Sequence, residues 1–205
     1  MNDAIENILK NNPAIWRAGE VAKGKQESLS TGFPALDAAL PNDGWPQNTL
    51  IEVITPCWGM GELTLFLPLL KQATANGNYA VLISPPYIPY APGFLHQQMP
   101  LENIIIMPKE KVAEHTLWIL EKVLRTQACG VAIAWPGQLP EKSIRRLQLA
   151  AEKGNSLGII FHHRDVKASP AALRIRLTTL KNSLQIDILK ARGASRFKRI
   201  QVDLF

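Results

Sequence analysis

Short apolar runs alternate with segments of helical periodicity through the middle of this chain. Such runs are typical of strands buried on both faces of a parallel sheet, and the segments between them have the 3.6-residue spacing of helices. Strands are predicted at residues 49–54, 79–84, 103–107, 130–135 and 157–161, and helices at 63–76, 93–99, 111–126 and 140–153. This alternation predicts an α/β fold with a mostly parallel central sheet and helices on both faces.

The pattern changes in the last part of the chain. Residues 173–177, 184–188 and 200–204 alternate apolar and polar side chains, which is typical of strands with one face in solvent. The polar positions include Arg174, Arg176 and Asp187. We therefore expect antiparallel strands added at the edge of the sheet, with these side chains on the wet face.

The first residues form a different kind of segment. Asp3 and Glu6 have the spacing of a capping box, and the residues that follow the cap place one apolar stripe on a short helix. This stripe consists of Ile5, Ile8 and Leu9, which are candidate partner-binding residues. The domain prediction is an amphipathic arm and connector at 1–29, followed by a core at 30–205. A frayed terminus is the alternative, because short isolated helices are marginally stable.

Charge is distributed unevenly along the 205 residues. Residues 1–163 carry 13 Lys and Arg against 14 Asp and Glu, a net of −1, whereas residues 164–205 carry 10 against 3, a net of +7. A basic end on a neutral body suggests weak, nonspecific contact with nucleic acid, and a solvated sheet edge is the alternative. The candidate nucleic-acid-binding residues are Arg164, Lys167, Lys190, Arg192, Arg196, Lys198 and Arg199.

Several other classes of protein are disfavoured. Cys57 and Cys129 lack a neighbouring Cys or His at metal-ligand spacing, so we expect reduced thiols and no metal site. No apolar run approaches the roughly 20 residues that cross a bilayer, and the first residues lack the pattern of a signal peptide. We expect a cytoplasmic protein with no membrane contact, associated with the nucleoid when engaged.

Motifs in residues 30–70 resemble the entry to the core of the RecA recombinase family. They are "STGFPALD", "DGWP" and the run "TLIEVITPCWGMGEL"; "GIIFHH" at 158–163 and the closing segment 188–204 are also similar to that family. The resemblance implies a RecA-like P-loop fold over residues 30–205. "AIWRAGE" at 14–20 and "GMGEL" at 59–63 narrow it to the ImuA family of bacterial translesion-synthesis cassettes. That family implies an adaptor in the SOS response that binds an ImuB-like, polymerase-family scaffold and contacts RecA or DNA.

The phosphate loop of this family pattern is degenerate here. A working loop needs G-x-x-x-x-G-K-[ST], whose amides, lysine and hydroxyl hold phosphate and Mg²⁺. With Gly61 as the second glycine, Glu62 takes the place of the lysine and Leu63 that of the hydroxyl residue. Trp135 stands where the family has an Asp for Mg²⁺. The residues Gly59, Gly61, Glu62, Leu63 and Thr64 therefore predict a loop without a nucleotide, and we expect no cofactor and no catalytic activity.

A second resemblance gives an alternative function. The segment from Leu65 to about Arg176 resembles SulA, the cell-division inhibitor, through "FLPLLKQ", "GVAIAW" and "AAEKGNSLGIIF". It implies an inhibitor that binds the tubulin-like division GTPase FtsZ. Under this alternative, residues 1–50 and the basic C-terminal end are dispensable for partner binding.

Overall fold

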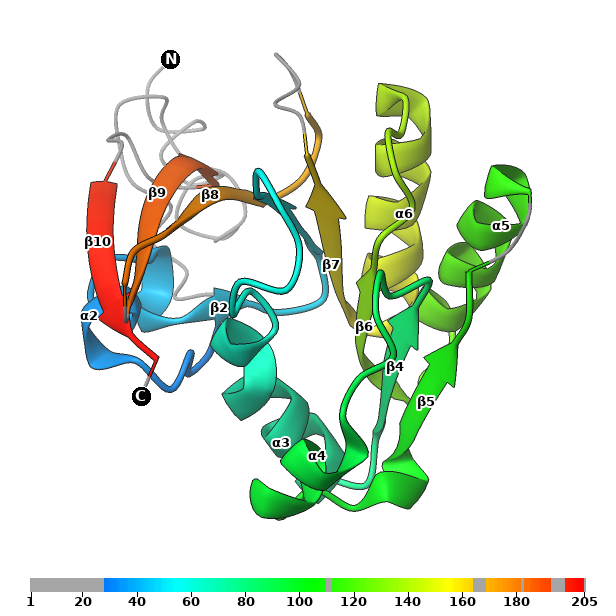
Figure 1. Ribbon diagram of the computed structural model, residues 1–205. Helices are drawn as coiled ribbons and strands as arrows, with labels where there is room; N and C mark the ends of the chain where they lie inside the picture. Colours follow the sequence, from blue (N-terminus) through cyan, green and yellow to red (C-terminus); the bar gives the residue numbers. More distant parts are fainter. Residues whose placement is uncertain (1–27, 110–111, 164–168, 182, 193–197, 205) are drawn as a thin grey trace, which may run out of the picture.

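One eight-stranded sheet forms the centre of the molecule (Figure 1). The computed structural model describes residues 28–109, 112–163, 169–181, 183–192 and 198–204. The strand order is β10-β9-β8-β3-β7-β6-β4-β5. The strands are β3 (Leu50–Ile54), β4 (Tyr79–Ile83), β5 (Ile104–Met107), β6 (Cys129–Ala134), β7 (Leu157–His162), β8 (Leu173–Thr179), β9 (Ser183–Ala191) and β10 (Lys198–Asp203).

The pairing confirms most of the expected sheet and corrects one part of it. Strands β3 to β8 pair with one another in parallel, and β9 and β10 add antiparallel pairs beyond β8 at one edge. The prediction of antiparallel pairing for residues 173–177 holds for one of the two neighbours: β8 pairs with β9 in antiparallel register, but it joins β3 in parallel register, with Ile51 opposite Leu173. As a result, β8 is an interior strand and its polar positions are less exposed than alternation suggested.

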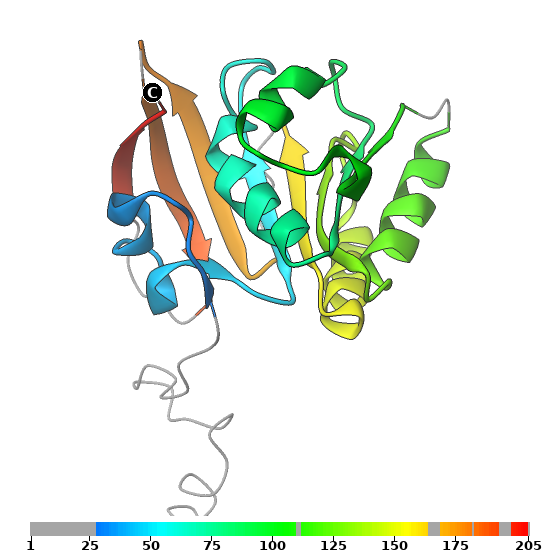
Figure 2. The ribbon, with the colours of Figure 1, turned by 90° about the horizontal axis from the view of Figure 1, so that it is seen from below.

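Helices cover both faces of the sheet, as predicted. Figure 2 shows α3 and α4 on one face and α5 and α6 on the other. These helices are α3 (Leu67–Ala75), α4 (Ala91–His96), α5 (Ala113–Leu124) and α6 (Glu141–Gly154), and short 3₁₀ turns precede α3 at Thr64–Phe66 and β5 at Leu101–Asn103. Each helix begins and ends within a few residues of its predicted range.

The sheet separates two apolar clusters, which explains why its inner strands are apolar on both faces. Alternate residues of β3 divide between them: Ile51 and Val53 pack with α3, while Leu50 packs with α5 and α6. Glu52 stands on the same face as Leu50 and is completely buried. A charged residue in the middle of a core strand needs partners, and these are described with the site.

The start of the core is organised by one carboxylate. Asp37 of α2 (Pro34–Asp37) accepts bonds at 2.8 Å from the Ser30 hydroxyl and from the Thr31 N–H. The "STG" and "LD" parts of the recognised motif are thus held together by hydrogen bonds. A 3₁₀ turn at Pro41–Asp43 follows. A two-stranded sheet of β1 (Ser28–Leu29) and β2 (Trp45–Pro46) was not predicted, because two residues are too short to show a period.

The predicted arm falls outside the described residues, and so do Ile5, Ile8 and Leu9. Its helix and its role stay predictions. Among the residues that the structure describes, no helix is long and apolar enough to cross a membrane.

Candidate functional site

The loop at residues 55–63 follows β3 at the carboxyl edge of the parallel sheet, where open α/β sheets commonly bind ligands. Its amides are occupied by the chain itself. The Glu62 carboxylate accepts 2.8 Å hydrogen bonds from the N–H of Gly59 and the N–H of Met60. Glu62 is only 6% exposed although Gly59 and Met60 are exposed. The side chain that replaces the expected lysine therefore acts as an internal anion within its own loop.

The backbone of this loop depends on glycine at two positions. Gly59 has φ +78° and Gly61 has φ +89°, a region that other residues rarely adopt. A Cβ on Gly61 would also lie 2.7 Å from Leu204, which follows β10. The positive φ alone therefore favours glycine at position 61, and its presence does not depend on a phosphate ligand. This is a structural reason for the glycines that gave the loop its likeness to a phosphate loop.

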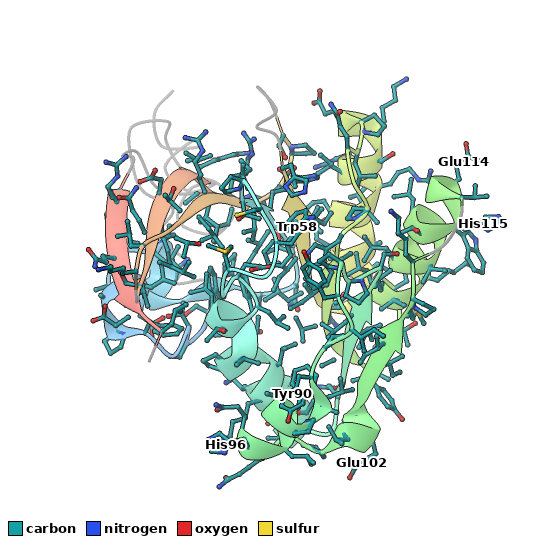
Figure 3. The ribbon with its side chains drawn as sticks, viewed as in Figure 1. Trp58, Tyr90, His96, Glu102, Glu114 and His115 are labelled. Carbon is teal, nitrogen blue, oxygen red and sulfur yellow. The ribbon has the colours of Figure 1, made fainter. Side chains whose placement is uncertain are left out.

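Aromatic side chains fill the space beside the loop. Trp58 lies beside β7 (Figure 3), with its ring 3.8 Å from the His163 ring and edge-on to Phe161. Trp135 follows β6 and stacks on Phe161 with 5.0 Å between ring centroids. The two tryptophans thus lie near the edge where Mg²⁺ and phosphate would need polar ligands. Trp135 is a packing residue in this structure.

A cavity of about 200 Å³ opens next to these rings. It lies between the loops that follow β3, β6 and β7, and it is lined by Trp58, Gly137, Gln138, Leu139, Phe161, His162 and His163. Among the described residues that line it there is no Lys, Arg, Asp or Glu, although polyphosphate binding needs cations or a bound metal. The cavity suits an apolar group better than a nucleotide phosphate.

Behind the loop, a charged cluster is buried within three neighbouring strands. The Glu52 carboxylate of β3 lies 3.1 Å from His162 Nε2 on β7 and 3.3 Å from Arg174 Nε on β8. Ser169 Oγ also donates to it. His162 Nδ1 lies 3.2 Å from the Gly137 carbonyl oxygen, so both ring nitrogens face oxygen atoms that can accept a hydrogen bond. The cluster ties the strands beneath the loop to the cavity wall.

The charge balance of this cluster determines the protonation of Glu52. Burial by itself raises the pKa of the Glu52 carboxyl. Hydrogen bonds from His162 and Ser169, together with the charges of His162 and Arg174, outweigh burial and hold the pKa below its ordinary value of 4.5. Glu52 is therefore an ionised carboxylate inside the fold. Arg174 is 7% exposed, so the prediction that it lies on a wet face was wrong.

Three of the basic residues predicted to meet nucleic acid make contacts within the described part of the fold. Arg199 binds Asp187 at 2.6 Å, and Lys198 donates to the Ala39 carbonyl oxygen at 2.9 Å. Lys190 donates to the Ser169 carbonyl oxygen at 2.6 Å. Adjacent residues of β10 point to opposite faces, which separates Lys198 from Arg199. Arg192 is exposed, while Arg164, Lys167 and Arg196 fall outside the described residues.

Lys190 lies close to other basic side chains of the fold. Its pKa is lowered, first by burial and then by the positive charges of Arg192 and Arg174. Contact with DNA stays a prediction.

The cysteines are both free, as predicted. Cys57 is exposed in the loop after β3 and Cys129 is buried at the start of β6. Burial raises the pKa of the Cys129 thiol to about 12, so this thiol is unreactive near neutral pH. Within the described ranges, no group of three His, Cys, Asp or Glu side chains is placed to hold a metal ion.

Comparison with known proteins finds two likenesses. A family model described as "Cell division inhibitor SulA" matches residues 57–158, a stretch just under half of the chain. The RecA proteins of Streptococcus pyogenes serotype M5 (strain Manfredo) and Streptococcus equi subsp. zooepidemicus (strain MGCS10565) are each 36% identical to this chain over 85 residues, which is 40% of this chain. The chain spans only 22% of the length of these RecA proteins.

Proposed function

We propose that this protein is a noncatalytic, RecA-like accessory protein of the SOS-type DNA damage response. It acts as an adaptor in mutagenic translesion synthesis and binds a polymerase-like scaffold of the ImuB kind, with RecA and DNA as weaker contacts. The similarity to RecA supports the link to DNA damage. The strand order and the loop after β3 are compatible with a P-loop fold whose phosphate chemistry is gone.

The bond pattern of Glu62 is the observation that carries the proposal. Amides that would cradle phosphate already hold a carboxylate, and an incoming phosphate would meet its negative charge. Like charges about 4 Å apart repel by roughly 4 kcal/mol at an effective dielectric near 20. With Trp135 at the end of β6, the site lacks the groups that position Mg²⁺ and water. Protein binding needs none of these groups.

Titration with Mg-ATP is expected to give no saturable heat and no hydrolysis. The reason is the repulsion by Glu62, together with the apolar wall of the neighbouring cavity. Isothermal calorimetry with ATP up to about 1 mM detects binding as weak as a Kd of about 1 mM, which corresponds to a binding free energy of about −4 kcal/mol. Saturable binding in the micromolar range would contradict the proposal.

A second candidate function has its own support. The family model for the cell-division inhibitor SulA covers residues 57–158, which include most of the loop after β3, the two tryptophans beside it and β6. Under this reading the protein blocks polymerisation of the tubulin-like division GTPase by binding it, and again no catalytic residue is needed. The matched range begins after the arm and ends before β8. Under this alternative, the arm and the C-terminal strands are therefore not needed to bind the division GTPase.

Substitution of the arm separates the two candidates. In full-length protein captured from DNA-damaged cells, replacement of Ile5, Ile8 and Leu9 by Ser is expected to abolish recovery of the polymerase-like scaffold. The thermal midpoint should stay nearly unchanged, because the stripe serves a partner.

Recovery of the division GTPase by both the wild type and the variant would favour the SulA-like function. Failure of the wild type to recover either protein would contradict both candidates. A large loss of thermal stability in the variant would mean that the arm packs on its own core.

A further inference from the structure

The outer surface of α5 and α6 carries positive charge around exposed apolar side chains. Figure 2 shows both helices on one face of the sheet, and an ion pair between Arg146 of α6 and Glu121 of α5 joins them. Beyond their first turns, these helices and the C-cap of α5 expose five cationic side chains, together with one Trp and one Leu. We call this surface the basic face, and it consists of Trp118, Lys122, Arg125, Arg145, Arg146, Leu149 and Lys153.

Helical spacing places these residues on one side of the two helices. In α5, Trp118, Lys122 and Arg125 are four and three residues apart, so they share one face. In α6 the cations recur at the same spacing before and after Leu149, while Leu147 among them is completely buried. The basic face is therefore the solvent side of a helix pair whose other side packs on the sheet.

Little negative charge opposes these cations. Of the four carboxylates on α5 and α6, Glu121 is the one that lies among them, and its side chain is only 13% exposed. The other three lie in the first turn of each helix or against a separate cavity, and they are Glu114, Glu141 and Glu152. Five cationic side chains and one carboxylate give this surface a formal net charge of +4.

The contacts of these cations show what the basic face can hold. Arg125 donates to one oxygen of Glu121 at 2.8 Å and Arg146 donates to the other oxygen, so one carboxylate already sits between two guanidinium groups. Arg145 and Lys153 make no hydrogen bond or ion pair among the described residues. Their donors are therefore open to the carboxylates of a ligand.

Apolar surface lies among the same cations. Trp118 is 59% exposed and Leu149 is 48% exposed. Lys122 Nζ lies 5.7 Å from the centre of the Trp118 ring, a cation–π contact, so the ring is held in place while much of its area still faces solvent. A ligand that covers the basic face therefore has to offer apolar groups as well as negative charge.

This combination favours an acidic peptide over nucleic acid. Arginine clusters recognise acidic motifs through paired hydrogen bonds to carboxylates, and an apolar side chain of the same peptide can pack on Trp118 and Leu149. Single-stranded nucleic acid binds by stacking successive bases on aromatic side chains, of which the basic face has one. It also has no aliphatic group to cover Leu149.

We propose that the basic face binds an acidic peptide segment of a partner protein, in which Asp or Glu residues are interspersed with apolar ones. Carboxylates of the segment pair with Arg145 and Lys153, and its apolar side chains pack on Trp118 and Leu149. The inference goes beyond the proposed function, which places scaffold binding on the N-terminal arm, because it gives the core a docking surface of its own.

Fluorescence anisotropy with the full-length protein tests the inference. The probe is a fluorescein-labelled peptide of Glu-Glu-Leu repeats, and we expect saturable binding that weakens as salt is raised, because salt screens exposed charges. Arg145→Glu combined with Lys153→Glu should weaken binding at least about tenfold, and Trp118→Ala at least about threefold. The matched control combines Lys71→Glu on α3 with Lys181→Glu between β8 and β9, both exposed away from the basic face, and should stay within about twofold of the wild-type affinity.

Five results would overturn the inference. They are no saturable binding of the peptide, unchanged affinity in a basic-face variant, an equal loss in the control pair, equal affinity for a peptide of Glu-Glu-Ser repeats, and tighter binding of an oligothymidylate than of the peptide at the same salt concentration. Recovery of the polymerase-like scaffold from cells is a separate measurement. Scaffold recovery without peptide binding would overturn this inference alone, whereas peptide binding without scaffold recovery would contradict the proposed function alone.

Discussion

Replacing Glu52 by Gln is expected to lower the free energy of unfolding by about 3–5 kcal/mol. The side chain is completely buried, and its carboxylate is the counter-charge of both His162 and Arg174. Removing one member of a buried ionic cluster leaves the remaining charges without compensation, and this costs more than the cluster itself contributes. Denaturant unfolding at neutral pH, followed by far-UV circular dichroism, measures the loss.

Asp187→Asn is the matched control for this substitution. Asp187 lies in the same sheet and binds Arg199 at 2.6 Å, but Arg199 is largely in solvent, with 70% of its side chain exposed. Exposed ion pairs are screened by water and contribute little. The control should therefore lose only a small fraction of what Glu52→Gln loses. Equal losses in the two variants would contradict the assignment of Glu52 as the centre of the buried cluster.

The same cluster predicts how stability depends on acid. Because the folded state holds the pKa of Glu52 below 4.5, the unfolded state binds this proton more readily as the pH falls. The stabilisation is present above pH 4.5 and is lost as the pH falls through the lower, folded-state pKa. The difference in stability between the wild type and Glu52→Gln should therefore narrow over that range. A difference that stays constant during acidification would contradict the ionised carboxylate.

The local pattern of apolar and polar residues was sufficient to predict the inner strands and the helices between them. Runs such as "YAVLI" are apolar at every position because both faces of the sheet are covered, so their bounds could be predicted to within a residue or two. The direction of β8 was not predictable in this way. Alternation in "LRIRL" is typical of an exposed antiparallel strand, but it arises here because Arg174 points at a carboxylate. That carboxylate lies far away in the sequence, and only the pairing of β3 with β8 brings the two together.

The sequence predicted which phosphate-binding residues are replaced at the site, but it did not predict the contacts that the replacing residues make. The sequence indicated that Glu62 and Trp135 replace the groups that bind phosphate and Mg²⁺. It did not indicate that Glu62 would bind the amides of its own loop, because that depends on the backbone of Gly59 and Gly61. The role of Glu52 was missed altogether. A single carboxylate inside the apolar strand "LIEVI" is the signal that could have revealed it, since such a residue is almost never buried without partners.

Replacing Glu62 by Ala is expected to lower the free energy of unfolding by about 1.5–3 kcal/mol, because two charge-assisted hydrogen bonds to the loop backbone are lost. The loss of unfolding free energy is no larger because Gly59 and Met60 are exposed, so water can replace part of the hydrogen bonding to their amides. Glu62→Gln keeps one acceptor oxygen and should lose about half as much. Glu102→Ala is the control, since Glu102 is an exposed carboxylate without a hydrogen bond or ion pair among the described residues.

Amide hydrogen exchange distinguishes this local role from a general loss of stability. In Glu62→Ala the amides of Gly59 and Met60 should exchange at least about tenfold faster, because each loses its only acceptor within the described structure. The amide of Thr55, which donates to the His162 carbonyl oxygen at 2.9 Å, should change only with global stability. If the Gly59 and Met60 amides keep their wild-type protection, Glu62 does not hold the loop. Another group would then protect these amides, and the argument from Glu62 against a phosphate ligand would lose its physical basis.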